Sequence, residues 1–272
     1  MSAVCPICPH RCVLSDGAIG LCRARQNTGG VVRSINYGMI TSIALDPIEK
    51  KPLYCFYPGS FILSVGSFGC NFCCPFCQNH EISMSGLQGS AAIYYSPEKL
   101  VDVAIETRSS GNIGIAFTYN EPLIGYEYVR DTAVAARQRN LQTVLVTNGY
   151  VNEKPLLDLL PNINALNIDL KSFSKDFYRR ICGDLDTVKK TIELASERAH
   201  VEITTLIIPG ENDSAEEMRN LTRWLSGIDP HIPYHITRFY PRYKMTDKSP
   251  PPESTIESLA EIASESLSRV FA

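Results

Sequence analysis

The sequence predicts an α/β fold in which parallel strands alternate with helices, preceded by a small cysteine-rich segment. Three observations lead to this prediction. Short apolar runs separated by helical periods fill the chain from Phe61 onward, polar residues follow nearly every one of these runs, and four cysteines lie in the first thirty residues. The pattern alone fits either an open doubly wound sheet or a barrel with six of the eight units of a complete barrel.

The segment before Phe61 differs in composition from the rest of the chain. Its first thirty residues contain four cysteines among proline and glycine, namely Cys5, Cys8, Cys12 and Cys22. Little apolar periodicity accompanies them, so a bound metal would have to order this stretch. Residues 31–45 predict two short strands around Tyr37-Gly38, and residues 46–60 a proline-rich connector. We therefore expect a cysteine-rich segment over 1–58 and the barrel over 59–272.

Six apolar runs have the length and β-branched content of buried strands. They are residues 61–66, 113–119, 143–148, 165–170, 201–208 and 235–240. Between them, helices are expected to begin at Ser96 followed by Pro97, at Ser214 with Glu217 as a capping box, and at Ser254 with Glu257. In the last helix, one face is expected to carry Ile256, Leu259, Ala263, Leu267 and Val270.

Composition and charge narrow the classes of function. The chain has 26 Lys and Arg against 29 Asp and Glu, a net charge of −3, which argues against charge-driven binding to nucleic acid or a membrane. No signal sequence and no apolar run of membrane-spanning length is present, so a cytoplasmic protein is expected. In a reducing compartment, the clustered members of its ten cysteines predict metal binding rather than a disulfide framework.

The stretch GCNFCCPFCQN, residues 69–79, follows the first predicted strand and holds four of these cysteines. Cys70, Cys74 and Cys77 have the spacing C-x3-C-x2-C, which suits three corners of a [4Fe–4S] cluster and leaves one iron open. The alternative is a closed zinc site with Cys73 as the fourth ligand. Because Cys73 and Cys74 are adjacent and point in different directions, the open cluster is the favoured interpretation.

The loop GCNFCCPFC resembles the signature of the radical S-adenosylmethionine (radical SAM) enzymes, with Phe76 at the aromatic position of the motif. This resemblance implies a partial TIM barrel, (β/α)6, with Cys70, Cys74 and Cys77 holding the catalytic [4Fe–4S] cluster. It implies SAM as the second cofactor, while Cys73 has no role in the family.

Further positions carry the resemblance over residues 61 to about 245, and they supply the expected contacts to SAM. TYNEP, 118–122, is similar to a Gly-Gly-Glu-Pro segment that holds the SAM amino group. NIDLK, 167–171, and PYHITRFYPRYKM, 233–245, are similar to segments of glycyl-radical activating enzymes. The residues that this similarity assigns to SAM binding are Phe76, Asn120, Glu121, Asn148, Asp169, Lys171 and His235. Taken singly, these residues also have interpretations that do not involve SAM. The Glu121 carboxylate would stabilise the start of a helix, and a lone histidine such as His235 would be a hydrogen-bonded residue of the core.

The four N-terminal cysteines have the spacing C-x2-C-x3-C-x9-C, with His10 available as a further ligand. A closed structural zinc is the favoured interpretation, and a second iron–sulfur cluster or free thiols are the alternatives. CPICPHRC, GAIGLCRAR and DPIEKKPLYCFYPGS together resemble the AmmeMemoRadiSam-system branch of radical SAM proteins, which are homologues of pyruvate formate-lyase activating enzyme. The role of Cys55 stays open, and Cys182 is expected to be buried structure.

The chemistry implied by the resemblance is reductive cleavage of SAM to methionine and a 5′-deoxyadenosyl radical, with flavodoxin or ferredoxin as electron donor. The radical would act on an unidentified substrate, small molecule or protein, by hydrogen abstraction or radical addition. One alternative is an activase that removes a hydrogen from a glycine of a protein partner. Another is a non-catalytic zinc or iron–sulfur interaction protein. Candidate substrate contacts lie near the last predicted strand: Arg238, Tyr240, Arg242 and Tyr243.

Overall fold

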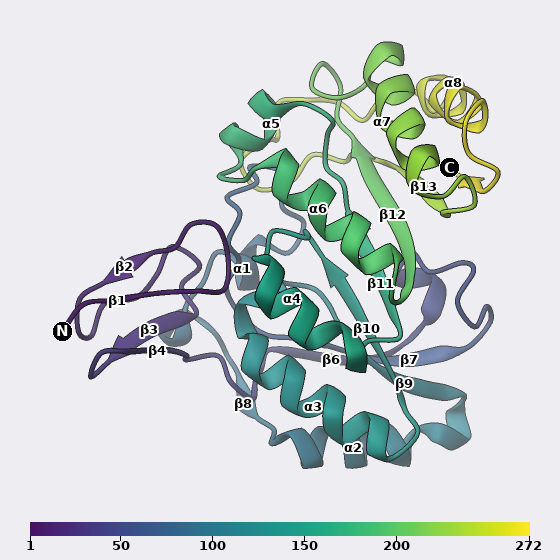
Figure 1. Ribbon diagram of the computed structural model, residues 1–272. Coiled ribbons are helices and arrows are strands. Elements are labelled where there is room, and N and C mark those ends of the chain that lie inside the picture. Colours follow the sequence, from purple (N-terminus) through teal and green to yellow (C-terminus); the bar gives the residue numbers. More distant parts are fainter.

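One eight-stranded sheet organises the molecule, which the computed structural model describes over residues 1–272 (Figure 1). Seven neighbouring strands run parallel, and β6 joins one edge antiparallel to β7. In spatial order the strands are β14 (Val270–Phe271), β13 (Tyr234–Arg238), β12 (His200–Ile207), β11 (Ala165–Asp169), β10 (Gln142–Thr147), β9 (Asn112–Phe117), β7 (Phe61–Gly66) and β6 (Ser42–Pro47). The two edge strands do not pair, so the sheet forms an incomplete barrel, and the expected partial α/β barrel is confirmed.

Helices connect successive parallel strands and cover the outside of this sheet. They are α2 (Pro97–Glu106), α3 (Tyr126–Gln138), α4 (Glu153–Leu159), α5 (Lys175–Arg180), α6 (Leu185–Ser196), α7 (Ala215–Ile228) and α8 (Glu253–Ser264), with a short α1 (His80–Ser83) after the cysteine loop. Each of the longer helices buries one apolar face, such as Leu100, Val101 and Ala104 of α2. This burial, more than helix propensity, stabilises helices of such length.

Two of the three predicted helix starts are confirmed. Ser96 accepts a hydrogen bond from the backbone N–H of Lys99, and Ser214 accepts one from that of Glu217. The carboxylate of Glu217 does not complete a capping box, because it accepts from Ser172 Oγ and the Phe173 N–H instead. The prediction at Ser254 is wrong, since α8 begins at Glu253 after Pro252 and has no side-chain cap.

The end of the chain also differs from the expected single helix. Ile256, Leu259 and Ala263 are buried on one face of α8, as predicted, but the helix ends at Ser264. Val270 belongs instead to the two-residue strand β14, which pairs with β13 and adds a seventh parallel strand. A register of only two residues leaves no periodic pattern that sequence reasoning could recognise.

The proline-rich connector closes the N-terminal end of the barrel. Ile48, Leu53 and Phe56 pack with residues of the barrel strands β7, β9, β10 and β11 in a small apolar cluster. The carbonyl oxygen of Pro52 accepts a hydrogen bond from Asn167 of β11, 2.8 Å away. This end of the barrel is therefore plugged, and access from solvent is left to the opposite end.

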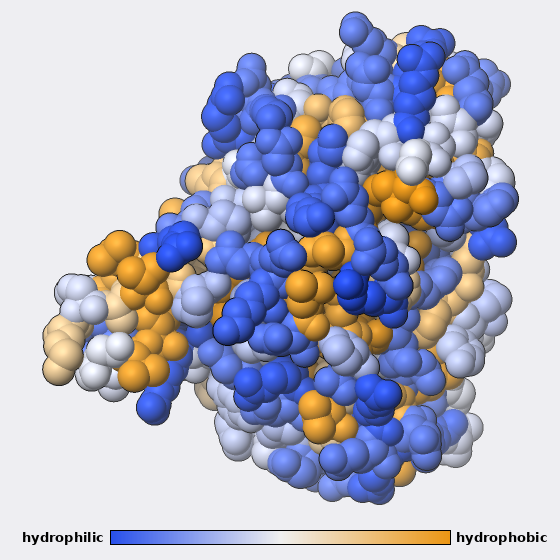
Figure 2. Space-filling model, in the orientation of Figure 1, coloured by the Kyte–Doolittle hydropathy of each residue, from blue (hydrophilic) through white to orange (hydrophobic).

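Residues 1–34 form a module at the side of the barrel, at the left of Figure 1. It contains two antiparallel hairpins, β1 (Ala3–Val4) with β2 (Val13–Leu14) and β3 (Arg25–Thr28) with β4 (Val31–Ser34). Figure 2 shows apolar side chains on its surface, and the exposed ones include Met1, Val4, Val13, Ile19, Leu21 and Val31. A further short pair joins β5 (Met39–Ile40) to β8 (Ile93–Tyr94).

The expected boundary at residue 58 does not coincide with an edge of the main sheet, because β6 pairs with β7 over residues 42–47. The connector that follows β6 then plugs the barrel, so both pieces belong structurally to the barrel. No helix in the chain combines the length and the apolar character needed to cross a membrane.

Candidate active site

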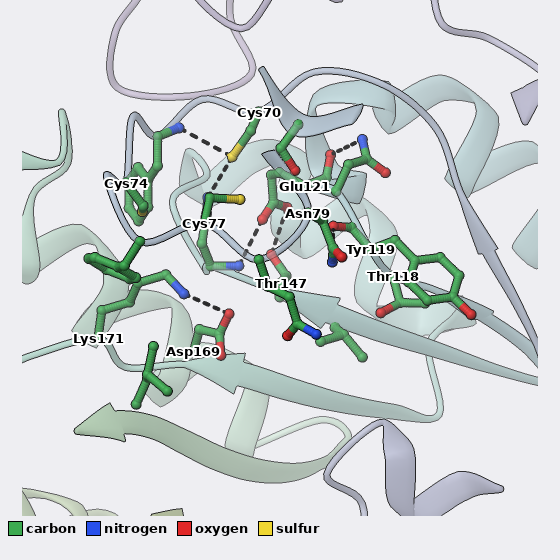
Figure 3. A pocket seen from close by; sticks show the side chains of 18 of the residues that line it. Cys70, Cys74, Cys77, Asn79, Thr118, Tyr119, Glu121, Thr147, Asp169 and Lys171 are labelled. Carbon is green, nitrogen blue, oxygen red and sulfur yellow. Dashed lines mark hydrogen bonds and ion pairs between the residues drawn. The ribbon is translucent and has the colours of Figure 1, made fainter. Parts of the chain in front are cut away.

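A cavity of about 280 Å³ opens at the C-terminal ends of the parallel strands (Figure 3). The carboxyl ends of parallel strands are where α/β folds of both kinds carry their sites. Cysteine side chains enter it from the loop after β7, and polar side chains enter from the ends of β9, β10 and β11. Of the predicted site residues, it is lined by Cys70, Cys74, Phe76, Cys77, Asn120, Glu121, Asn148, Asp169 and Lys171.

The cysteine loop begins at a glycine that the backbone requires. Gly69 has φ = 87°, and a Cβ atom there would collide with the carbonyl oxygen of Cys22 in the N-terminal module. Asn120 fixes the same stretch, because its amide donates to the carbonyl oxygens of Phe68 and Gly69 and its Oδ1 accepts from the Ser67 N–H at 2.9 Å. These contacts fix the backbone of residues 67–69 in a conformation that directs Cys70 into the cavity.

Cys73 stands outside the cavity, as predicted. Its sulfur forms a disulfide with Cys182, which follows α5. Sequence reasoning did not anticipate this bond, and the remaining eight cysteines are free thiols. Since Cys73 is directed away, the thiols that share the cavity are those of Cys70, Cys74 and Cys77.

Three thiols on one loop, facing one cavity, fit a [4Fe–4S] cluster with one iron left for a ligand. Burial raises the pKa of both Cys70 and Cys74, that of Cys74 to about 12, although the Lys171 ammonium acts in the opposite direction. Buried thiols of this kind ionise when a metal centre supplies positive charge. No three His, Cys, Asp or Glu side chains are arranged to hold a single metal ion.

Lys171 and Asp169 form an ion pair at the end of β11, with the ammonium 2.8 Å from the carboxylate (Figure 3). Burial lowers the pKa of Lys171 by itself, but the charges of Asp169 and Cys74 outweigh it and raise that pKa. The lysine therefore carries its positive charge beside Cys74, where it favours the thiolate. Asp169 is the more exposed partner, with 35% of its side-chain surface accessible.

Glu121 supports the cavity wall from within. Its carboxylate accepts hydrogen bonds from the Leu123 N–H at 3.0 Å, the Thr147 hydroxyl at 2.7 Å and the Asn148 N–H at 2.7 Å. Burial raises its pKa to about 7 although these three bonds favour the charged form. All these partners are protein groups, so the carboxylate joins the ends of β9 and β10.

Asn148 links the two walls of the cavity. Its amide donates to Asn71 Oδ1 at 2.8 Å and lies 3.8 Å from the Cys70 sulfur. Asn71 in turn donates to the Tyr150 carbonyl oxygen. A hydrogen bond toward a cluster thiolate adjusts the electronic properties of an iron–sulfur centre.

His235 does not reach the cavity. It is the second residue of β13, 3% exposed, and its Nε2 lies 2.6 Å from Glu202 at the plugged end of the barrel. Glu202 also accepts from His200 Nε2 and from the backbone N–H groups of Tyr54 and Cys55. The prediction of a contact with SAM conflicts with this position: a residue at the start of a parallel strand lies at the end opposite the site. The interpretation as a hydrogen-bonded core histidine describes the observed contacts.

Sequence reasoning missed several lining residues. Thr118 and Tyr119 directly follow β9. Thr204 and Leu206 alternate with Glu202 along β12 and so share its inward face. Thr237 stands two residues after His235 on β13, nearer the cavity. The period of two along each predicted strand was the signal that could have identified them. Asn79, which donates to the Tyr119 carbonyl oxygen at 2.8 Å, lay in a loop without such a signal.

The comparisons with known proteins agree with this arrangement. The model of the radical SAM superfamily matches residues 64–222. The uncharacterized protein MJ0808 of Methanocaldococcus jannaschii is 39% identical over 264 residues, which cover 96% of this chain and 78% of that protein. The pyruvate formate-lyase 1-activating enzyme of Escherichia coli K12 is 24% identical over 209 residues, covering 71% and 85%.

Among solved structures, Streptococcus suis SuiB bound to its precursor peptide SuiA is similar in fold. The TM-score is 0.62 at 13% identity, over 78% of this chain and 49% of that one. The chain belongs to the radical SAM superfamily. It is a radical SAM enzyme whose substrate is unknown, and membership of the family implies a [4Fe–4S] cluster and SAM as its cofactors.

Proposed function

We propose that Cys70, Cys74 and Cys77 hold the [4Fe–4S] cluster and that SAM binds beside it, against the ends of β9, β10 and β11. The supporting observation is that three thiols from one loop share a cavity of about 280 Å³ with polar groups from these strand ends. When bound there, the cluster supplies the electron that cleaves SAM to methionine and the 5′-deoxyadenosyl radical. The protein then holds the reacting parts in position and restricts water.

The residues divide into those that would touch SAM and those that position the wall. Phe76, 6% exposed, offers an apolar face to the adenine, and the Asp169–Lys171 pair offers both charges to the ribose or methionyl groups. The side chains of Asn120 and Glu121 form their hydrogen bonds with groups of the protein itself. We therefore assign to them positioning of the cysteine loop and of the ends of β9 and β10.

The substrate would enter over the segment that follows β13. Tyr243 stacks on His80, with ring centroids 4.6 Å apart, and the Lys244 N–H donates to the Pro75 carbonyl oxygen inside the cysteine loop. Tyr240 is 57% exposed nearby in sequence. Arg238, in contrast, bonds to the Pro251 carbonyl oxygen and to Glu253. Of the four substrate candidates, Tyr240 and Tyr243 are thus preferred to Arg238.

The test is anaerobic. The protein is reconstituted with iron and sulfide, SAM and dithionite are added, and 5′-deoxyadenosine is quantified. Product is expected in the wild type and in the control Cys55→Ser, whose thiol lies outside the cavity, but not in Cys74→Ser. Failure of the reconstituted wild type to bind SAM would refute the proposal.

A second candidate is the glycyl-radical activase, favoured by the 24% identity with the pyruvate formate-lyase 1-activating enzyme. An AmmeMemoRadiSam-system enzyme acting on another substrate remains our first choice, since the N-terminal module of residues 1–34 has no assigned part in activation. Electron paramagnetic resonance (EPR) separates the two: incubation with a glycyl-radical protein encoded beside this gene gives a glycyl radical only if the chain is an activase. Flavodoxin or ferredoxin would supply the electron in either case.

A further inference from the structure

The sulfur of Cys70 accepts hydrogen bonds from two N–H donors of the protein. The backbone N–H of Phe72 lies 3.4 Å from this sulfur, and the side-chain nitrogen of Asn148 lies 3.8 Å from it. The first donor belongs to the cysteine loop itself. The second belongs to the residue that directly follows β10, so a different part of the barrel places a polar side chain beside this thiol.

The other hydrogen bonds of the Asn148 amide fix its orientation. Its Oδ1 accepts from the Tyr150 N–H at 2.9 Å, and its Nδ2 donates to Asn71 Oδ1 at 2.8 Å. Exchanging the oxygen and nitrogen of the amide would set two donors against each other at Tyr150 and two acceptors at Asn71. The nitrogen therefore faces Cys70, and its second hydrogen is left for the sulfur.

Asn71 is held in place by further contacts. Its Nδ2 donates to the Tyr150 carbonyl oxygen at 2.8 Å, and its own carbonyl oxygen lies 2.9 Å from His10 Nε2 of the N-terminal module. Asn71, Asn148 and Tyr150 are 1%, 5% and 6% exposed. The three residues thus form a buried ring of hydrogen bonds that fixes the Asn148 amide without any contact to SAM.

An N–H group directed at a thiolate ligand affects the reduction of an iron–sulfur centre. Reduction adds one negative charge, and a hydrogen bond to a ligating sulfur stabilises the more negative state. The bond is stronger where water is excluded. Loss of such a donor therefore lowers the reduction potential. Loss of a contact to SAM, in contrast, leaves the potential measured without SAM unchanged.

We propose that Asn148 raises the reduction potential of the centre held by Cys70, Cys74 and Cys77 through its hydrogen bond to the Cys70 sulfur, and that Asn71 holds the amide in position. Asn148 is then a positioning residue for the one-electron step that cleavage of SAM requires, and not a contact to SAM. This assignment rests on the proposed function, because it requires the three thiols to hold the cluster.

The test is a redox titration of the full-length protein, reconstituted without oxygen and followed by EPR in the absence of SAM. The variants are Asn148→Ala, Asn71→Ala and the control Asn112→Ala. Asn112 is also 5% exposed and fully hydrogen-bonded, but it begins β9 and bonds to no sulfur. The backbone N–H of Asn148 keeps its bond to Glu121 in every variant.

Asn148→Ala and Asn71→Ala should both titrate at a lower potential than the wild type, and Asn112→Ala at the same potential. At the wild-type midpoint, we expect the ratio of reduced to oxidised cluster to fall roughly tenfold in Asn148→Ala, which is about 59 mV for one electron. The double variant Asn71→Ala, Asn148→Ala should shift no further than Asn148→Ala, because both changes remove the same N–H···S bond.

An unchanged midpoint in Asn148→Ala, with about four irons retained, would overturn this assignment and leave the proposed function untouched. Weaker SAM binding at that unchanged midpoint would return Asn148 to the SAM contacts predicted from the sequence. Absence of iron from the reconstituted wild type would overturn the proposed function, and this assignment with it, so the two failures are distinguishable.

Discussion

Replacement of Glu202 by glutamine tests the buried network at the plugged end of the barrel. Glu202 is fully buried and accepts four hydrogen bonds, from the Tyr54 and Cys55 N–H groups, His200 and His235. Burial opposes its charge, yet hydrogen bonds from both histidines and both N–H groups lower its pKa from 4.5 to about 2. That difference corresponds to about 3 kcal/mol of stability at pH 7.

Glutamine keeps the shape but turns an N–H toward groups that themselves donate. We expect Glu202→Gln to lose about 3 kcal/mol of unfolding free energy at pH 7, a fall of roughly 6–12 °C in Tm. Because the folded pKa is depressed, the contribution is present above pH 4.5 and is lost as the pH falls toward about 2. The variant should therefore lose less stability than the wild type over that range.

Urea unfolding of the cluster-free protein between pH 3 and pH 7 measures both effects, with the exposed Glu216→Gln as the matched control. An equal stability of Glu202→Gln and the wild type at pH 7 would refute the reasoning. So would a loss of SAM binding by His235→Ala at unchanged stability, since that would return His235 to the SAM site.

Three further changes concern the cysteine loop. Cys73→Ser should retain the iron and sulfide of the wild type, because the Cys73 sulfur is bonded to Cys182, and iron loss equal to that of Cys74→Ser would show that it is a ligand. Asn120→Ala removes three hydrogen bonds to residues 67–69 and should cost about 2–3 kcal/mol in urea unfolding; a cost within error of zero would contradict its positioning role. Gly69→Ala should lower the free energy of unfolding by about 1–3 kcal/mol, because of the positive φ and the collision with the Cys22 carbonyl oxygen. An unchanged Tm would show that the Cys22 carbonyl oxygen does not restrict the residue at position 69.

The barrel strands could be predicted to within two residues at either end. Runs such as 61–66 and 201–208 are apolar and β-branched because parallel strands are buried on both faces. The same reasoning identified the loop after β7 and the polar strand ends that line the cavity. It failed for β14, whose two residues pair only because β13 is already in place.

His235 shows where the pattern was misread. Polar residues were expected at the ends of strands, and His235 stands at the beginning of one. Glu202 carried the missing signal, because a single carboxylate in the apolar run VEITTLII has to find buried partners. The Cys73–Cys182 disulfide joins positions 109 residues apart, and no local sequence pattern predicts such a contact.

The most direct test of the central claim is the EPR spectrum of the reduced cluster with and without SAM. The spectrum is recorded on the triple variant Cys5→Ser, Cys8→Ser, Cys22→Ser, because in this variant only the loop thiols can hold iron. If Cys70, Cys74 and Cys77 leave one iron open beside the cavity, addition of SAM changes the spectrum. The further change Cys74→Ser abolishes the signal. A cluster signal that SAM leaves unchanged would contradict the account.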